Sequence, residues 1–400
     1  MKTSFLRFWK NPVQLIYMVM AILLVAGGIN VFSASYVMAQ DMFGSGWYYL
    51  LRYFIFAGLG LLAMNIVRRV GYKIWLHKYL LWGAFLIVFV MLLVVDLLDV
   101  STKGASRWLY LGPFSVQPSE FAKLIIIMLA AKYLGRMLRR GERVSFLTSG
   151  DHRLVLAATI TYAALVYKQP DLGTAAIICG LMFGVYMIAG IPGWQVLLVL
   201  GGGSLGAAVA TLASPYRLER VKVWFDPWLD QAGAGYQMVQ SLLAIGSGNL
   251  VGTHWGHGAG KFFYLPEAHT DFAFAIFCQE NGFFGAMLLM LLFGLLGYAF
   301  CTITCSTRDK QGFLLAGGVT FLIVGQAVAN MAMVCGILPV IGVPLIFISY
   351  GGSSMMLSMA AIGLLLSVYD EEARRAEMDA LPPEERRDGL RVVRNERWRT

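Results

Sequence analysis

Polar and ionisable residues interrupt the apolar stretches of this sequence at three places, and chemistry is expected there. They are Gln117, Ser119, Glu120 and Lys123, then Lys168 and Asp171, then Glu267, His269, Thr270 and Asp271. An ionisable side chain at the centre of a bilayer costs roughly 2.5–3.5 kcal/mol. We therefore expect these groups to pair with each other, to line a transport path or to carry a reaction.

Glu120 and Lys123 are three residues apart, a spacing that places two side chains on the same face of a helix. Opposite charges at this spacing can pair, and pairing is how membrane interiors tolerate charge. The residues alone therefore favour a buried ion pair that holds helices in register, with a direct part in a reaction as the other interpretation.

Asp271 stands at the start of a predicted helix, after a polar run that contains Glu267, His269 and Thr270. In one interpretation Thr270 or Asp271 is an N-cap that accepts hydrogen bonds from free backbone N–H groups. In the other, Asp271 is a general base at the aqueous mouth of a cavity. A helix N-terminus lowers the pKa of a carboxyl group and desolvation raises it, so the residues leave both interpretations open.

Basic and aromatic residues near the same predicted membrane boundary suit a charged headgroup. Trp108 follows Arg107, either as an aromatic anchor at the interface or as a headgroup contact. Arg217 and Arg220 can clamp phosphates or simply lie at headgroup level. The sequence contains no Walker A loop, dinucleotide fingerprint, H-E-x-x-H or G-x-S-x-G motif, so ATP-driven transport and membrane proteolysis of those types lose support.

The elements that must position these residues are long apolar stretches. The 400 residues are 58% hydrophobic and 14% charged, which leaves too little polar surface for a water-soluble globule. The stretches are 13–33, 47–67, 79–98, 117–135, 153–168, 171–190, 194–213, 271–300, 312–335 and 351–369. Most can cross a bilayer as helices of roughly 20 residues. They predict an all-α integral membrane protein, a polytopic bundle of about ten transmembrane helices.

Charge placement predicts that both termini are cytoplasmic. With the N-terminus inside, the inner segments carry most of the 32 Lys and Arg residues, as the positive-inside rule requires. This divides the chain into an N-terminus at 1–12, a membrane domain at 13–369 with a long extracytoplasmic loop at 214–270, and a charged tail at 370–400. The net charge of +9 then belongs to flanks near anionic membrane lipid, not to nucleic-acid binding.

The segment 336–350 is apolar but is broken by Pro339, Gly342 and Pro344. Irregular backbone is not tolerated in direct contact with lipid, because its polar groups would lack hydrogen-bond partners. We therefore expect this segment to dip back into the bundle or to pack on protein.

The sequence resembles the SEDS family (shape, elongation, division and sporulation) over nearly its whole length. The matching stretches are 103–123, 169–174, 214–221, 235–248, 264–276 and 349–354. The resemblance implies a peptidoglycan glycosyltransferase that polymerises lipid II at the outer face of the bacterial cytoplasmic membrane. It further implies a class B penicillin-binding protein and other divisome proteins as partners.

The resemblance also assigns residues. Asp271 matches the family's catalytic aspartate, Trp108 matches another residue the family needs, and Glu120 and Lys123 match its structural ion pair. The substrate-binding candidates are Arg107, Trp108, Gln117, Ser119, Lys168, Asp171, Arg217, Arg220, Glu267, His269 and Thr270. A divalent cation, Mg or Mn, is the one cofactor considered, and its ligands are unknown.

Within the family, the stretches 214–221, 224–228 and 264–271 are more like the division member FtsW, whereas 336–344 is closer to RodA. This favours septal synthesis, with a RodA-type elongation polymerase as the alternative. Two positions depart from the family pattern: neutral Gln279 replaces an acidic residue, and Ile346 replaces a proline. A lipid II flippase and a non-catalytic scaffold are the competing classes of function.

Overall fold

Helices make up nearly all the regular structure of the computed structural model, which describes residues 11–98, 107–111, 114–146, 150–212, 215–256 and 265–380. A helix lies at each predicted apolar stretch. These are α2 (Pro12–Phe43), α3 (Tyr48–Val70), α5 (Lys78–Leu98), α6 (Pro118–Arg139), α7 (His152–Lys168), α8 (Leu172–Ile188), α9 (Gly193–Leu212), α12 (Ala273–Ser306), α13 (Lys310–Val334) and α14 (Gly352–Ala380). The protein is a multi-pass membrane protein, as predicted.

Within the described residues, six of these helices are long and apolar enough to cross a bilayer: α2, α3, α5, α12, α13 and α14. A helix satisfies its own backbone hydrogen bonds, which is why lipid forces apolar stretches into this form. The total of about ten spans and the cytoplasmic placement of the termini remain predictions.

Shorter elements join the long helices. They are α4 (Tyr72–Trp75), α10 (Pro215–Phe225), the 3₁₀ helix η1 (Pro227–Asp230), α11 (Tyr236–Ser247) and an antiparallel hairpin of β1 (Leu109–Leu111) and β2 (Phe114–Val116). In the hairpin, Leu109 pairs with Val116 and Leu111 with Phe114. The hairpin was not predicted. It brings Arg107 and Trp108 close to the start of α6.

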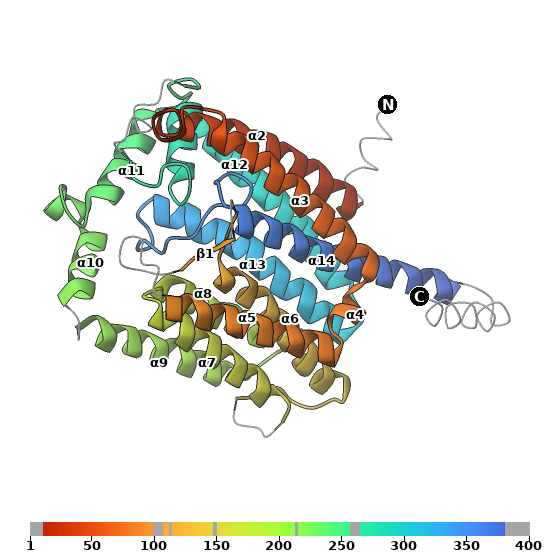
Figure 1. Ribbon diagram of the computed structural model, residues 1–400. Coiled ribbons are helices and arrows are strands. Elements are labelled where there is room, and N and C mark those ends of the chain that lie inside the picture. The colour runs from red at the N-terminus through yellow and green to blue at the C-terminus, as the bar shows by residue number, and fades with distance from the viewer. Residues whose placement is uncertain are drawn as a thin grey trace.

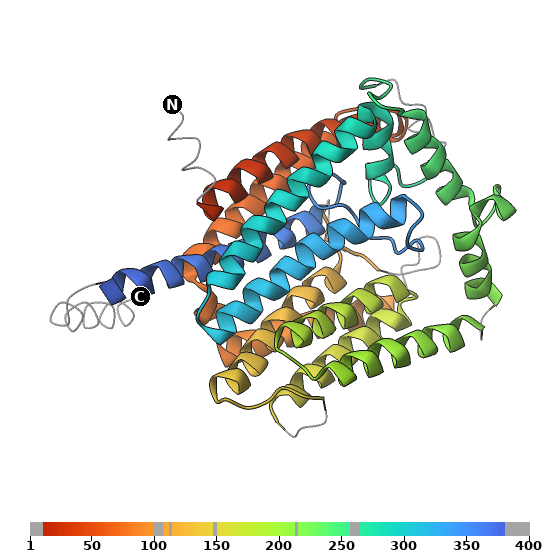
Figure 2. The same ribbon diagram turned by 180° about the vertical axis from the view of Figure 1, so that it is seen from behind.

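Two groups of helices lie side by side in the bundle. Figure 1 shows α2, α3, α12 and α14 together on one side, and α5, α7, α8 and α9 on the other, with α6 and α13 between them. The beginning of α2 and the end of α14 lie at one end of the bundle, while α10 and α11 cover the opposite end (Figures 1 and 2). The segment predicted as one long loop, 214–270, therefore includes ordered helices at one end of the bundle.

Charged pairs fasten the end of α14 to its neighbours. Arg68 of α3 donates two hydrogen bonds to Asp370, at 2.7 and 2.8 Å, and a third to the Tyr17 hydroxyl of α2. Lys73 of α4 pairs with Glu371. The helix α14 thus continues beyond the apolar layer to Ala380, so the first part of the predicted tail is helical. Residues 381–400 lie outside the described part of the chain.

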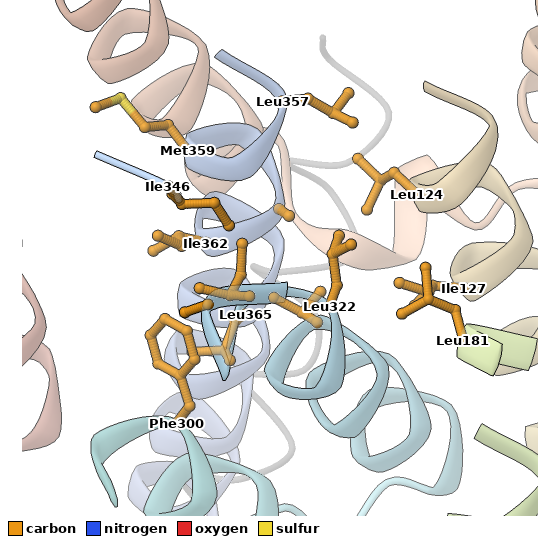
Figure 3. Packing of buried hydrophobic residues seen from close by; sticks show 14 of the residues in the cluster. Leu124, Ile127, Leu181, Phe300, Leu322, Ile346, Leu357, Met359, Ile362 and Leu365 are labelled. Carbon is orange, nitrogen blue, oxygen red and sulfur yellow. The ribbon is translucent and has the colours of Figure 1, made fainter. Parts of the chain in front are cut away.

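Apolar side chains from separate helices fill the centre of the bundle. In Figure 3, Leu357 of α14 points toward Leu124 of α6, and Leu322 of α13 lies between Ile362 and Leu365 of α14 on one side and Ile127 of α6 on the other. All six are buried. Close packing of this kind, rather than a hydrophobic driving force, is what associates helices in lipid.

The segment between α13 and α14 packs on protein, which confirms the prediction for 336–350. Side chains of the surrounding helices donate hydrogen bonds to the carbonyl groups of its irregular backbone. Tyr53 of α3 donates to the Phe347 carbonyl at 2.5 Å, and Gln326 of α13 donates to the Pro344 carbonyl at 3.2 Å. Gly27 of α2 lies so close that a Cβ there would collide with the Phe347 carbonyl. We call this segment the re-entrant segment.

Candidate active site

Asp271 lies in a short turn that precedes α12, and the helix begins two residues later than predicted, at Ala273. The backbone N–H groups of Thr270 and Phe272 donate to the Glu267 carbonyl at 3.1 and 3.2 Å. Phe272 occupies the N-cap position and makes no side-chain cap. The N-cap interpretation of Asp271 and Thr270 is therefore wrong, because the Thr270 hydroxyl instead donates to Glu267.

The carboxyl group of Asp271 is partly buried, and the residue lies two positions before the membrane-spanning helix α12 begins. A Cβ at Gly342 of the re-entrant segment would lie 3.5 Å from its Oδ2 atom. Burial raises the pKa of Asp271 to about 7, and the negative charges of Glu267, Asp171 and Glu120 act in the same direction while Arg107 opposes them. A carboxylate with a pKa near 7 is well matched to general base catalysis at neutral pH.

Arg107 and Asp171 form an ion pair, and the charges of both act on this carboxyl group. The Nε atom of Arg107 is 3.7 Å from Oδ2 of Asp171, and its Nη2 atom donates to the Pro170 carbonyl at 2.8 Å. Asp171 also caps α8, accepting from the backbone N–H of Thr174 at 3.1 Å and from its hydroxyl at 2.9 Å. Asp171 thus anchors Arg107 beside Asp271, while its own oxygens are occupied by structural contacts.

Glu120 and Lys123 form the ion pair that their spacing predicted. Lys123 Nζ lies 2.7 Å from Glu120 Oε1, and both side chains are buried. Lys123 also donates to Gln326 Oε1 at 3.1 Å, and Gln326 contacts the re-entrant segment at Pro344. The pair therefore connects α6 to α13 and to the segment that lies beside Asp271.

The other predicted residues near this site differ in how deeply they are buried and in which residues they contact. His269 is buried in a cluster with the rings of Tyr49 and Tyr350, and burial lowers its pKa. Trp108 is partly exposed, Gln117 is half-buried and Ser119 is buried. Lys168 is engaged away from Asp271, in a 2.6 Å ion pair with Asp96 of α5. The structure thus brings Arg107, Glu120, Asp171 and Glu267 into the electrostatic surroundings of Asp271 and gives Lys168 a different partner.

Arg217 and Arg220 belong to α10, but their side chains lie outside the described part of the structure. In the described residues no group of three or more His, Cys, Asp or Glu side chains converges as metal ligands do. Mg²⁺ is commonly bound by one or two carboxylates together with waters and substrate phosphates, and Asp271 could serve as one such carboxylate.

The helix that follows Asp271 is interrupted at Gly282, whose φ of 67° and ψ of −168° are not helical. Backbone carbonyls of the segment 247–256 replace the lost helical partners: Asn249 accepts from Phe283 N–H at 2.9 Å, and Leu250 accepts from Phe284 N–H at 3.2 Å. A Cβ at residue 282 would collide with the backbone of Gly252. Only glycine therefore fits this break.

A buried carboxylate just before the break is tied to the same segment. Glu280 accepts from the Ser33 hydroxyl at 2.5 Å and from the Gly256 N–H at 3.1 Å. Gln279, the departure from the family pattern, donates to the Ser247 hydroxyl at 2.8 Å. A cavity of 510 Å³ opens between α2 and α12, and Glu280 and Asn30 lie at its polar end. Asp271 does not line this cavity.

Two buried amides that sequence reasoning missed lie closest to the backbone of the Asp271 turn. Asn330 of α13 donates to the carbonyl of Asp271 itself at 2.8 Å, and Asn30 of α2 donates to the carbonyl of Ala273 at 3.0 Å. The signal available in the sequence was a single asparagine inside each of two apolar helices, where an unpaired polar group is expensive. That signal indicates a partner without saying which.

Comparisons with known proteins show to which family the chain belongs. A family model that unites FtsW, RodA and SpoVE, described as cell cycle protein, matches residues 13–374. Stage V sporulation protein E of Bacillus subtilis (strain 168) is 36% identical over 364 residues, which cover 90% of this chain and 97% of the relative. The probable peptidoglycan glycosyltransferase FtsW of Aliivibrio salmonicida (strain LFI1238) is 39% identical over 368 residues, which cover 90% of this chain and 89% of the relative.

Solved structures have the same fold. One, described as "Structural coordination of polymerization and crosslinking by a peptidoglycan synthase complex", superposes with a TM-score of 0.74 at 27% identity and covers 89% of this chain and 97% of that one. The rod shape determining protein RodA of Thermus thermophilus superposes with a TM-score of 0.64 at 27% identity, covering 89% of this chain and 96% of that one.

Proposed function

This chain belongs to the FtsW/RodA/SpoVE family of cell cycle proteins, and from that premise we propose that it is a peptidoglycan glycosyltransferase with Asp271 as its general base. The substrate is lipid II, as both donor and acceptor. The observation that carries the assignment is a partly buried carboxyl group beside Arg107, with its pKa raised to about 7.

The chemistry follows from the groups that meet. Asp271 removes the proton from the 4-hydroxyl of the acceptor sugar as that oxygen attacks the anomeric carbon of the donor. The new C–O bond forms with inversion, while the bond to the undecaprenyl pyrophosphate breaks and its electrons leave with the phosphate. A positioned base of this kind contributes roughly 10²–10⁴ in rate.

The leaving pyrophosphate needs positive charge rather than a proton donor. Arg107 is the described cation nearest the carboxylate, and Arg217, Arg220 or a Mg or Mn ion carried by the substrate can add to it. Trp108, partly exposed beside Arg107, offers an apolar face to a sugar ring. Gln117, Ser119, His269 and Thr270 remain candidates for the headgroup site.

We propose a class B penicillin-binding protein as the partner that crosslinks the product, together with other divisome proteins. The similarity to a complex of polymerisation and crosslinking supports this choice. We further propose that the enzyme works in the cytoplasmic membrane at the division septum, which the relatives named FtsW support.

The direct test gives lipid II to the purified full-length protein, with its transpeptidase partner, in detergent. Detergent abolishes sidedness, so glycan chains can appear only if the protein polymerises. The wild type should form chains and Asp271→Asn, an isosteric and neutral change, should lower the rate by at least about 100-fold. Both proteins should elute and unfold alike.

Each alternative has its own outcome in this assay. A flippase forms no glycan in detergent, even as wild type. If Asp271→Asn polymerised at near the wild-type rate, Asp271 would not be the base. A scaffold would still support growth of cells that carry Asp271→Asn alone, whereas a polymerase would not.

A further inference from the structure

Two asparagines from different helices make the same kind of bridge on either side of the Asp271 turn. Asn330 Nδ2 donates to the Asp271 carbonyl at 2.8 Å and to the Val343 carbonyl at 2.5 Å. Asn30 Nδ2 donates to the Ala273 carbonyl at 3.0 Å and to the Ile348 carbonyl at 3.4 Å. Each amide nitrogen thus uses both hydrogens to join the turn to the re-entrant segment.

Both asparagines lie in the buried interior of the bundle, where an unpaired polar group is costly. Asn330 is fully buried, and 3% of Asn30 is exposed. The amide oxygens of both residues are buried, and no described residue donates a hydrogen bond to either. A side chain that leaves its own oxygen unsatisfied is unfavourable unless its donors are needed where they lie.

Three of the four acceptors, the carbonyls of Asp271, Val343 and Ile348, lie in irregular backbone, and the fourth belongs to Ala273, the first residue of α12. The turn at 267–272 precedes the first helical residue, and the re-entrant segment is irregular. Their main link is Tyr350 N–H, which donates to the His269 carbonyl at 2.8 Å. Neither Asp271 nor Gly342 belongs to a strand or a helix. Without the asparagines, no regular hydrogen bonding would therefore set the distance between them.

We propose that Asn330 and Asn30 are positioning residues that hold the Asp271 carboxylate in its catalytic place against the re-entrant segment. The proposal rests on the proposed role of Asp271 as the base. Asn330 acts on the backbone of Asp271 itself, and Asn30 acts two residues later. Neither touches the reacting atoms, so their loss should change how well the base works and not how the lipid binds.

The first test compares Asn330→Ala with Tyr53→Phe. Tyr53 also donates to the re-entrant segment, at Phe347, and its other acceptor is the Leu24 carbonyl of α2, so Tyr53→Phe removes a similar buried donor without releasing Asp271. Asn330→Ala should lower kcat for lipid II polymerisation about 10- to 100-fold, because a displacement near 1 Å can cost that much. KM should change little, and Tyr53→Phe should stay within about threefold of the wild type.

The pH profile supplies a readout that general loosening of the fold would not move. Asp271 is faced by Glu267 from its own turn, Glu120 from α6, Asp171 before α8 and Arg107 before β1, and all four remain in Asn330→Ala. A released turn exposes the carboxyl group to water, which lowers its pKa. The acid limb of kcat should therefore shift to lower pH than in the wild type. Asn330→Ser, which keeps one donor, should recover part of kcat.

Two results would overturn the proposal: a kcat and acid limb in Asn330→Ala equal to those of Tyr53→Phe, or a loss of activity that follows only the fraction of folded protein. If Asn330→Ala does not fold, Asn330→Ser and Asn30→Ala are judged by the same two measurements. Failure of the base assignment is distinguishable, because Asp271→Asn would then remain active whatever the asparagine variants do.

Discussion

At the scale of single residues, the partial burial of Asp271 decides its chemistry. An aspartate in water has a pKa near 4 and is a poor base for a sugar hydroxyl, whereas burial and three acidic neighbours move the pKa of Asp271 to about 7. Arg107 limits the rise and is the cation that we propose for the leaving phosphate. One position thus combines a stronger base with a nearby cation.

The rate of polymerisation should depend on pH through this carboxyl group. Only the ionised form accepts a proton, so kcat should rise as the pH increases through about 7 and level off above it. Initial rates from pH 5 to 9, with saturating lipid II, measure this limb. In Glu267→Gln the limb should move to lower pH, because a negative neighbour that raises the pKa has been removed. A wild-type limb centred near pH 4 would contradict this account.

At the scale of elements, the Glu120–Lys123 pair of α6 holds charge inside the bundle in a form that lipid tolerates. Both side chains are buried, and Gln326 of α13 provides the third contact. A buried pair is not strongly stabilising against an apolar replacement, but removal of one partner leaves an uncompensated charge. The pair should therefore behave as a unit.

Lys123→Met should lower the free energy of unfolding by about 3–5 kcal/mol, because it leaves Glu120 buried without its cation. The double variant Glu120→Gln with Lys123→Met should recover most of that loss. Thermal and denaturant unfolding of the purified variants in detergent measure both effects. A double variant less stable than Lys123→Met would show that the pair is more than a compensated charge.

The long helices and the Glu120–Lys123 pair could be predicted from the sequence, because the solvent around them is lipid. Lipid leaves an apolar stretch little choice but a helix, so the long helices follow from local composition, and the Glu120–Lys123 pair follows from local spacing. The bridges from Asn30 to Ala273 and Ile348 join residues 243 and 318 positions apart. No local pattern encodes such contacts. The helix start at Ala273 shifted for a related reason: Glu267 takes the contacts expected of a cap.

At the scale of the whole molecule, the two ends of the bundle differ in kind. One end holds the charged contacts that fix α14 to α3 and α4, including Arg68 with Asp370 and Lys73 with Glu371. The helices α10 and α11 cover the other end (Figures 1 and 2). Basic residues at the first end are expected in the cytoplasm, so we expect Asp271 to face the opposite side of the membrane.

If the protein serves division, a functional fluorescent fusion expressed at its native level should gather at midcell before constriction, and Asp271→Asn should gather there too because recruitment does not need catalysis. Live-cell imaging measures this. Even labelling along the side wall would indicate the elongation role instead.

The break at Gly282 divides α12 into two helical parts that meet at this residue. The first part begins next to the Asp271 turn. At the break, backbone carbonyls of the segment 247–256 accept hydrogen bonds from the N–H groups of Phe283 and Phe284. Separating that segment from α12 would leave two N–H donors without acceptors, at about 1–3 kcal/mol each. This cost opposes bending at Gly282 but is small enough for a moderate force to overcome. Any displacement of the segment 247–256 would therefore act on α12 at Gly282, in the same helix that begins next to the Asp271 turn.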